Sequence, residues 1–540
     1  MLRRRRPKTT GSDAESVPSG VEDLAVGADV SHDAVDDAAA AALPLALESS
    51  DLLGADVLST DLLSTSEAGP AAVRGGALRV SSFLAGTLVS VGAAALLFRH
   101  LGVVDTGRYA TALSLSALVT GLTDLGLTAI GVREYAVLTG ERRASVARNL
   151  LGMRLVLTAI GVVAVAAFAA LAYGRLLALG VLIAGVGVLV QNTQATLAVP
   201  LIASLRLGWV SLLDFMRQIV VAVLIVALVL AGAHLLPFLA AAGVAAAVVL
   251  VPTAALVREK IPLRASFERR EWFAMLGPVL VYSAAVAAGT LYFRVAIVLV
   301  SLIAGARELG YYSLSFRVVE VMFLLPGLLV GAAFPIFARA ARDDLARLGY
   351  ALGRVFQVSL ILGVWIALSL AVGARFAVLV VGGHKFLPAV PVLAVQGVGV
   401  GASFVGAVWA YGMLSLRLHR VILIFNLAML ALVATLVGLL AAVDGAEGAA
   451  IGTAIAEIVG ALSAGFLLAR GRPYLKPNLA VVPRVAVAAL LGATPALATG
   501  VPVVVRIVIA TVIYGFALLI LRAIPAELLD LLPARLRSGR

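Results

Sequence analysis

The segment LFRHLGVVDTGRYATALSLSAL, Leu97–Leu118, has a second copy in SLIAGARELGYYSLSFRVVEV, Ser301–Val321. Each copy holds a glycine, a short charged stretch, a second glycine and a tyrosine before the chain turns apolar again. At one constant offset, Gly102 corresponds to Gly305, Asp105 to Glu308, Gly107 to Gly310, and Tyr109 to Tyr312. The tripeptide AGT at 85–87 recurs at 288–290 with the same offset. This duplication predicts that the chain contains two related halves.

The composition is that of a membrane protein. The chain is 62% hydrophobic and 13% charged, with a mean hydropathy of +1.06. Soluble domains are about half apolar and about a quarter charged, so lipid must solvate much of this surface. The formal net charge of +12 could indicate nucleic-acid binding, but basic cytoplasmic loops explain it better and no nucleic acid is expected as a partner. The absence of cysteine excludes disulfide and thiol chemistry.

From Ala77 onward, apolar runs long enough to cross a bilayer as helices alternate with short polar breaks. The sequence therefore predicts an all-α polytopic membrane protein with about fourteen transmembrane helices. The expected spans are 77–98, 109–131, 151–173, 178–203, 210–232, 235–257, 275–302, 311–336, 355–374, 388–413, 421–443, 448–469, 482–500 and 502–522.

The distribution of basic residues predicts the orientation. With a cytoplasmic N-terminus, most Lys and Arg of the loops lie inside, as the positive-inside rule requires. The expected outer loops carry only Arg99, Arg108, Arg175, Arg307, Arg375 and Lys385. Both termini are therefore expected in the cytoplasm, with the chain in the cytoplasmic membrane.

The spacing of the repeat predicts the architecture. An even number of crossings separates the two copies, so they face the same way, and a parallel repeat has a pseudo-twofold axis along the membrane normal. We expect two six-helix lobes, 76–258 and 272–471, and a C-terminal helix pair, 482–522, followed by a basic cytoplasmic C-terminus, 523–540. Transporters with parallel repeats bind substrate at the seam between the lobes.

Residues 1–75 differ from the rest of the chain. From Thr9 to Val73 there is no Lys or Arg, while acidic residues recur. Low hydrophobicity with one sign of charge predicts a disordered cytoplasmic tail. One alternative function follows, in which the protein is a scaffold that recruits envelope polysaccharide assembly proteins through this tail.

The loops provide no catalytic apparatus. Every predicted connection is short, and the sequence contains neither a P-loop nor an HExxH motif nor a convincing acidic metal motif. The sequence therefore predicts a protein that is not an enzyme and uses no cofactor or metal. Transport energy would come from an ion gradient or from the gradient of the substrate.

The same segments carry a family resemblance. Residues 77–136 combine the LG…GRY hairpin, the sequence TDLGL at 123–127 and a short basic loop. The second half adds GGHKFLPAVPVLAVQGVGVG at 382–401 and DGAEGAAIGTAIAEIVGAL at 444–462. Over about 76–470 the chain resembles the polysaccharide-biosynthesis flippases of the multidrug/oligosaccharidyl-lipid/polysaccharide (MOP) exporter superfamily.

The resemblance implies two lobes in a V around a central polar cavity. It implies a flippase that moves a polyprenyl-diphosphate-linked oligosaccharide between leaflets by alternating access, with membrane lipids around it. The alternatives are a cation-coupled multidrug exporter and a lipid II flippase of the same superfamily. Lipid II flippases usually carry extra arginines in the first helix, whereas the corresponding stretch here, 82–97, contains none.

Three charged residues within the predicted spans are candidates for contact with a diphosphate or with a coupling ion. An Arg at mid-bilayer costs about 2.5–3.5 kcal/mol on insertion scales, so charge at that depth indicates function or pairing. Arg294 lies too deep in its span for easy snorkelling. Arg317 and Glu320 lie three residues apart and share a helix face. We expect Arg294 and Arg317 to bind substrate and Glu320 to bind a coupling ion. The alternatives are an interhelical ion pair for Arg294, and mutual neutralisation of Arg317 and Glu320.

The remaining candidates are more scattered. Asp124, beside two glycines, is expected to bind a coupling ion or to satisfy the backbone of a broken helix. Asn426 is a further cavity candidate, and Glu457 in AIAEIVG is either an ion-coupling residue or a hydrogen-bond partner for a neighbouring helix. Arg154, with Asp214 and Arg217, is expected to snorkel or pair locally.

Overall fold

The computed structural model describes residues 68–124, 126–204, 206–258, 264–276, 280–470, 472–497 and 500–525. Within these ranges every element is helical. The predicted acidic tail up to residue 67 and the C-terminal segment from residue 526 lie outside the described residues. The first described helix begins at Ala68, before the point at which the sequence predicts the tail to end.

The first half of the molecule comprises residues 68–258. Its helices are α3 (Ala68–Asp124), α4 (Leu127–Val137), α5 (Gly140–Tyr173), α6 (Arg175–Ala203), α7 (Leu207–Leu230) and α8 (Leu235–Val257). In α3 the chain breaks at Gly102, whose φ of 73° lies in the left-handed region that glycine adopts without steric cost. This break lies in the hairpin predicted from the repeat.

The second half comprises residues 280–470. Its helices are α10 (Leu280–Ile303), α11 (Gly305–Met322), α12 (Leu324–Asp343), α13 (Leu345–Val381), α14 (Ala389–Ser415) and α15 (His419–Ala469). The last of these breaks at Asp444 and Gly445, where the backbone leaves helical geometry. A short helix, η2 (His384–Phe386), joins α13 to α14.

The helices define a polytopic membrane protein of about 10–12 spans, as the sequence predicts in kind. Ten helices of the described ranges are long and apolar enough to cross a membrane, and two of them contain the breaks at Gly102 and at Asp444–Gly445. Two shorter apolar helical stretches, Ala287–Ile303 and Val481–Ala493, accompany them. A count of fourteen is therefore not established.

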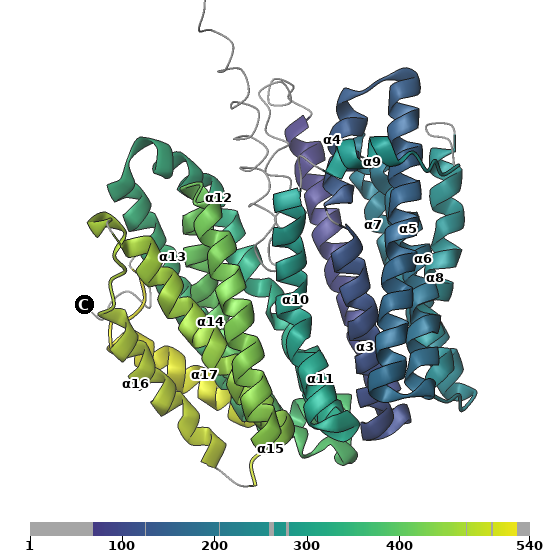
Figure 1. The fold of residues 1–540 in the computed structure, drawn as a ribbon. Helices are drawn as coiled ribbons and strands as arrows, with labels where there is room; N and C mark the ends of the chain where they lie inside the picture. Colours follow the sequence, from purple (N-terminus) through teal and green to yellow (C-terminus); the bar gives the residue numbers. More distant parts are fainter. Residues whose placement is uncertain are drawn as a thin grey trace, which may run out of the picture.

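The molecule has two ends, distinguished by their turns. The hairpin end holds the breaks at Gly102 and Asp444–Gly445 and the turn at Ala304. The tail end is the opposite one, where α3 begins. Figure 1 shows α11 and α3 meeting near the hairpin end, while α4, α9 (Arg269–Leu276) and α12 lie towards the tail end.

The two halves meet mainly through α3, which packs against α10, α11 and α13 of the second half. At the hairpin end this contact is reciprocal: a Cβ on Gly107 would overlap the carbonyl oxygen of Ala306, and one on Gly310 would overlap that of Val103. Since Gly107 corresponds to Gly310 in the repeat, the repeated hairpins pack on each other through equivalent positions. Only glycine permits so close an approach of two backbones.

Two polar contacts flank this junction. The guanidinium of Arg99 in the first half donates to the carbonyl oxygens of Leu379 and Val380, at 3.0 and 2.6 Å. The Tyr173 hydroxyl hydrogen-bonds the Ser301 hydroxyl in the second half. In contrast, α4 packs on α5 and α6 at the tail end, while α12 packs chiefly on α13 and α14. The halves are therefore joined most closely at the hairpin end.

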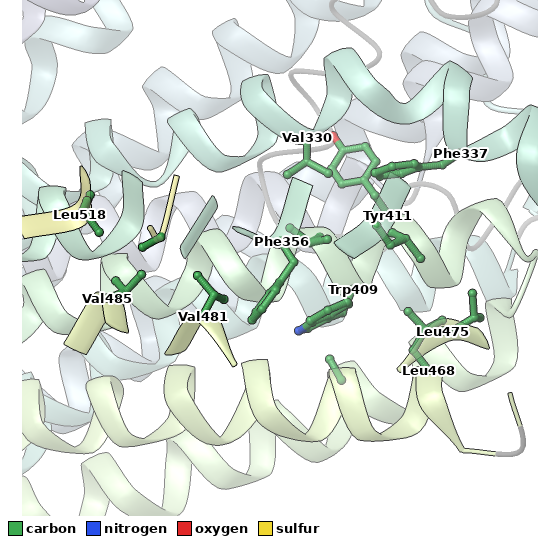
Figure 2. Close-up of a cluster of buried hydrophobic side chains, with 14 of the residues drawn as sticks. Val330, Phe337, Phe356, Trp409, Tyr411, Leu468, Leu475, Val481, Val485 and Leu518 are labelled. Atoms are coloured by element: carbon green, nitrogen blue, oxygen red, sulfur yellow. The ribbon is translucent and has the colours of Figure 1, made fainter. Parts of the chain in front are cut away.

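The C-terminal helices extend the core of the second half. Helices α16 (Val481–Ala493) and α17 (Val503–Ile520) pack on α13, and η3 (Pro473–Leu475) leads into them. Figure 2 shows Val485 and Leu518 of this pair in one apolar cluster with Phe356 and Trp409. Because no charged side chain belongs to this cluster, its role is packing.

Candidate functional site

The seam cluster is formed by Arg294, Arg317, Glu320 and Ser90, where three helices meet. Arg317 and Glu320 lie one turn apart on α11, with Nη1 of Arg317 2.8 Å from Oε2 of Glu320. Arg294 on α10 donates from Nη2 to Oε1 of the same carboxylate at 3.5 Å. One carboxylate thus holds two guanidinium groups.

Ser90 places this cluster at the boundary between the halves. Nη2 of Arg317 donates to the Ser90 hydroxyl on α3 at 2.5 Å. The side chains of Arg294, Arg317 and Glu320 are 26%, 31% and 28% exposed, so none is sealed within the protein. With two guanidinium groups against one carboxylate, the cluster carries a surplus positive charge within a membrane-spanning region.

The predicted pairing of Arg317 with Glu320 is present, and Arg294 joins it from the neighbouring helix. Pairing lowers the cost of placing charge in the membrane, because each ion gains a partner in place of water. It does not cancel the charge, because two cations share one anion. The planar fork of N–H donors on each arginine is a group that can bind carboxylate or phosphate oxygens in pairs.

A second group lies in the interior of the second half. Tyr292 on α10 donates its hydroxyl proton to Oε1 of Glu457 on α15, at 2.6 Å. The two residues line a small, partly open pocket. Its other lining residues are Phe293, Ala296, Tyr312, Phe316, Val319, Phe323, Gln396, Gly399, Val433 and Thr453. This acidic, aromatic pocket differs in chemistry from the seam cluster, although Tyr292 and Arg294 lie on the same helix.

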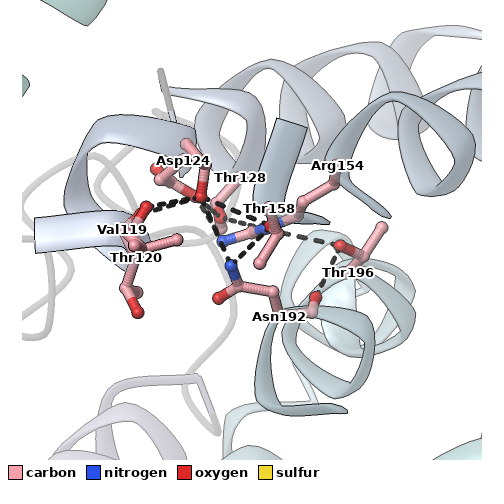
Figure 3. A network of polar contacts seen from close by, with 9 residues as sticks. Val119, Thr120, Asp124, Thr128, Arg154, Thr158, Asn192 and Thr196 are labelled. Carbon is pink, nitrogen blue, oxygen red and sulfur yellow. Dashed lines mark hydrogen bonds and ion pairs between the residues drawn. The ribbon is translucent and has the colours of Figure 1, made fainter. Parts of the chain in front are cut away.

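A third group, in the first half, surrounds Asp124 and Arg154. Asp124 is the last residue of α3, before α4 resumes at Leu127. Nη2 of Arg154 on α5 lies 2.5 Å from Oδ1 of Asp124, which also accepts the hydroxyl of Thr128 at 2.8 Å. Figure 3 shows Asn192, Thr158 and Thr196 around the pair. The Arg154 side chain is only 5% exposed.

The prediction for Arg154 is wrong. Snorkelling or pairing with a local partner is expected from the sequence, whereas Arg154 is buried against an acid on another helix. The other two residues of that prediction, Asp214 and Arg217, do pair locally, at 3.8 Å and one turn apart. Asp124 thus lies at a helix break, as its neighbouring glycines indicate, and its carboxylate also pairs with Arg154.

The predicted site residues therefore fall into three separate places. Arg294, Arg317 and Glu320 come together in the seam, Glu457 lies in the pocket of the second half, and Asp124 lies in the first half. Asn426 is partly buried in the first arm of α15 and does not line the pocket. Sequence reasoning missed Ser90, Tyr292 and Tyr312 because Ser and Tyr carry no formal charge that would mark them within an apolar span.

No metal site emerges from the acidic and histidine side chains. In the described residues no three His, Asp or Glu side chains come together as metal ligands. Glu457 and Glu320, for example, have Tyr and Arg partners respectively. The three polar groups are therefore held together by hydrogen bonds and ion pairs between side chains.

Comparison with known proteins defines the class. The family model described as polysaccharide biosynthesis protein matches residues 72–341, and the chain belongs to this family. That range contains α3 to α12 almost entire and includes the seam cluster. The protein is a multi-pass membrane protein of this family, and its fold is that of the MOP superfamily.

Two solved structures share this fold. A lipid II flippase MurJ, in an inward closed conformation, is 13% identical with a TM-score of 0.69, and the match covers 82% of this chain and 97% of that one. An inward-facing multidrug resistance MATE family transporter of the MOP superfamily is 15% identical with a TM-score of 0.54, covering 74% and 98%. No curated protein sequence matches. At these identities the structural likeness shows the fold alone.

Proposed function

We propose that this protein is a flippase that moves a polyprenyl-diphosphate-linked oligosaccharide, a precursor of envelope polysaccharide, from the inner to the outer leaflet of the cytoplasmic membrane. Membership of the polysaccharide biosynthesis family supports a lipid-linked glycan as the substrate class. The observation that carries the proposal is the seam cluster, in which two arginines share one carboxylate between the halves. A sugar diphosphate cannot cross hydrocarbon unaided, whereas its polyprenyl tail can remain in lipid.

The proposed arrangement in the membrane has fourteen helices. The arms of α3 and α15 would each count as two spans, and α10 and α16 would cross as well. The two lobes would then be 76–258 and 272–471 in a parallel repeat, with 482–522 as an added pair and both termini in the cytoplasm. The reciprocal glycine contacts support the repeat, since equivalent positions meet at the junction.

Alternating access would use the difference between the two ends. The close junction at the hairpin end would separate a bound headgroup from the outside, and its opening would release the headgroup to the outer leaflet. Arg294 and Arg317 would bind the diphosphate, and Glu320 would release them as it takes up a proton or cation. Glu457 and Asp124 are the other proposed coupling residues, and Asn426 would contact the glycan.

The test is headgroup movement in reconstituted vesicles that contain a labelled polyprenyl-diphosphate oligosaccharide. Arg294→Ala should reduce movement at least tenfold while the protein stays folded, because charge-assisted hydrogen bonds to phosphate contribute about 1.5–3 kcal/mol each. Arg294→Lys should retain part of the activity. The matched control is Arg217→Ala, which removes an arginine from a pair outside the seam. Wild-type movement by Arg294→Ala would remove this residue from the site.

The pocket around Glu457 favours a second candidate function. Its aromatic rings and single carboxylate suit an organic cation, since cations bind aromatic faces. A multidrug exporter would expel such a cation from loaded vesicles, and Glu457→Gln would abolish the efflux. The lipid II alternative is less well supported, because residues 82–97 of α3 contain no Lys or Arg.

A further inference from the structure

The tail end of the molecule presents an excess of exposed basic side chains. Six of them, three in each half, are Arg133, Arg206, Arg258, Arg339, Arg420 and Arg470. None of these six is in an ion pair within the part of the chain that the structure describes. We call this set the basic face. It spans both halves at the end where α3 begins.

Three acids at this end have local partners. Glu141 pairs with Arg148 at 2.7 Å, and Glu271 pairs with Arg142 at 3.2 Å. The carboxylate of Asp344 accepts the backbone N–H groups of Ala346 and Arg347 at the start of α13. Among the described residues, no carboxylate lies within ion-pair distance of the six arginines, so the basic face can take an anionic partner.

The chain itself supplies a complementary segment. Residues 1–67 contain 13 of the 30 acidic residues but only five of the 42 basic ones. All five basic residues precede Thr9. The acids are Asp13, Glu15, Glu22, Asp23, Asp29, Asp33, Asp36, Asp37, Glu48, Asp51, Asp56, Asp61 and Glu67. Positive-inside bias explains the basic face of a membrane protein, but it does not explain this acidic segment beside it.

The place where the acidic segment joins the body favours its contact with the basic face. The segment joins the body at Ala68, the start of α3, which is the helix through which the halves meet. At about 3.4 Å per residue, its contour could extend on the order of 200 Å, so reach does not limit contact with any part of the basic face. Tethering also gives a covalently linked partner an effective concentration on the order of millimolar.

We propose that the acidic segment, residues 9–67, docks on the basic face of its own chain. The segment competes there with other anions, including a diphosphate headgroup arriving from the same side. The docking stands on charge and connectivity alone, whereas its effect on transport rests on the proposed flippase function. A tethered segment is favoured over a separate acidic protein because one copy is always present beside each basic face.

The strength of this docking depends on salt. Each exposed ion pair contributes about 0–1 kcal/mol, so several must act together. The Debye length falls from about 10 Å at 0.1 M salt to about 3 Å at 1 M, which screens exposed pairs most strongly. The docked population should therefore be large at low ionic strength and small at high ionic strength.

The absence of cysteine in this chain allows a direct test. Spin labels on Ser49→Cys and Ala346→Cys of the full chain, in nanodiscs of phosphatidylcholine, report the distance between segment and body by pulsed electron resonance. We expect a short-distance population at 50 mM salt that falls at least twofold at 500 mM. Replacing Asp51, Asp56, Asp61 and Glu67 by Asn or Gln should remove it. The matched control, Ser59→Ala with Ser64→Ala and Ser66→Ala, should keep it.

Equal distance distributions in the variant with the four neutralised acids and in the serine control would overturn the proposal. So would a short-distance population that is unchanged between the two salt concentrations. Anionic phosphatidylglycerol in the nanodisc should compete for the basic face and reduce the docked population. If only lipid binds the basic face, no short-distance population will be seen in phosphatidylcholine, and the proposal is overturned. The label distances require no transport, so this test decides the docking even if the chain moves no glycolipid.

A transport measurement tests the consequence. Removal of residues 1–67 should raise glycolipid movement about twofold or more at 50 mM salt and leave it unchanged at 500 mM. A rise of equal size at both salt concentrations would show that the segment does not act through charge. Absence of movement with and without the segment would contradict the flippase function and leave the distance result standing.

Discussion

The pair of Asp124 with Arg154 and the seam cluster are both acid–arginine groups within the membrane-spanning part of the chain, yet they differ in balance. In the first half one carboxylate meets one guanidinium, and Arg154 is 5% exposed. In the seam one carboxylate meets two guanidinium groups, and each side chain is about a quarter to a third exposed. The charges of the first group balance each other. The seam cluster retains a net positive charge, which can attract an anionic ligand.

Burial explains why the two groups should respond differently to mutation. Removing one partner of a buried ion pair leaves an uncompensated charge, which costs far more than the pair contributed. A partly exposed cluster can relax or admit water when one member is lost. We therefore expect disruption of the group in the first half to reduce stability most, and disruption of the seam cluster to reduce ligand binding most.

The largest effect on stability should come from Asp124→Ala. Arg154 would lose its carboxylate partner while remaining buried, at a cost of about 3–5 kcal/mol of unfolding free energy. Thermal or denaturant unfolding in detergent measures this loss. Asp105→Ala is the matched control, because its pair with Arg108 is exposed and contributes under about 1 kcal/mol. Equal destabilisation by both changes would break the comparison.

Next in size is the effect of Arg317→Ala on headgroup binding. The loss of one guanidinium should weaken binding of a polyprenyl-diphosphate glycan by about 1.5–3 kcal/mol, roughly tenfold or more. Unfolding free energy should change by less than about 1 kcal/mol. Fluorescence titration with labelled glycolipid, alongside the unfolding measurement, separates the two quantities. A large loss of stability with unchanged binding would give the seam the role assigned to the first half.

A smaller effect of opposite sign is expected for Glu320→Gln. Neutralising the shared carboxylate frees both arginines, so anion binding should strengthen several-fold, about 1 kcal/mol. Asp124→Asn should give no such gain, because Arg154 is buried and out of reach of a ligand. Headgroup affinity of the two variants, measured side by side, checks this difference. Weaker binding by Glu320→Gln would mean that the carboxylate orients the arginines.

The smallest effect should come from Ser90→Ala. This change removes the hydrogen bond that Arg317 makes across the seam, and such bonds within membranes contribute about 0.6 kcal/mol on average. The result is a small loss in unfolding free energy and a broader distribution of distances between the halves. Thr435→Ala is the control, since the Thr435 hydroxyl donates to Ala431 of its own helix. A loss well above 2 kcal/mol would show that Ser90 supports the fold.

Part of the candidate site could be predicted from the sequence. Arg317 and Glu320 are three residues apart on one helix, so their proximity follows from helical periodicity. Arg294 could be identified as a charge within a predicted span. Its partner could not, because the approach of α10 to α11 depends on tertiary packing. The pairing of Asp124 with Arg154 was missed for the same reason, as the two residues lie on different helices.

The sequence by itself determined that this is a helical membrane protein with a duplicated hairpin. The apolar runs are long enough to cross a bilayer as helices, and a helix satisfies its own backbone hydrogen bonds in lipid. Both properties are local to the chain. Only the tertiary structure decided which charges meet. The fit of Gly107 and Gly310 against the opposite hairpin, and the position of Ser90 beside Arg317, depend on how two halves pack. Such contacts join residues distant in sequence, and no local pattern records them.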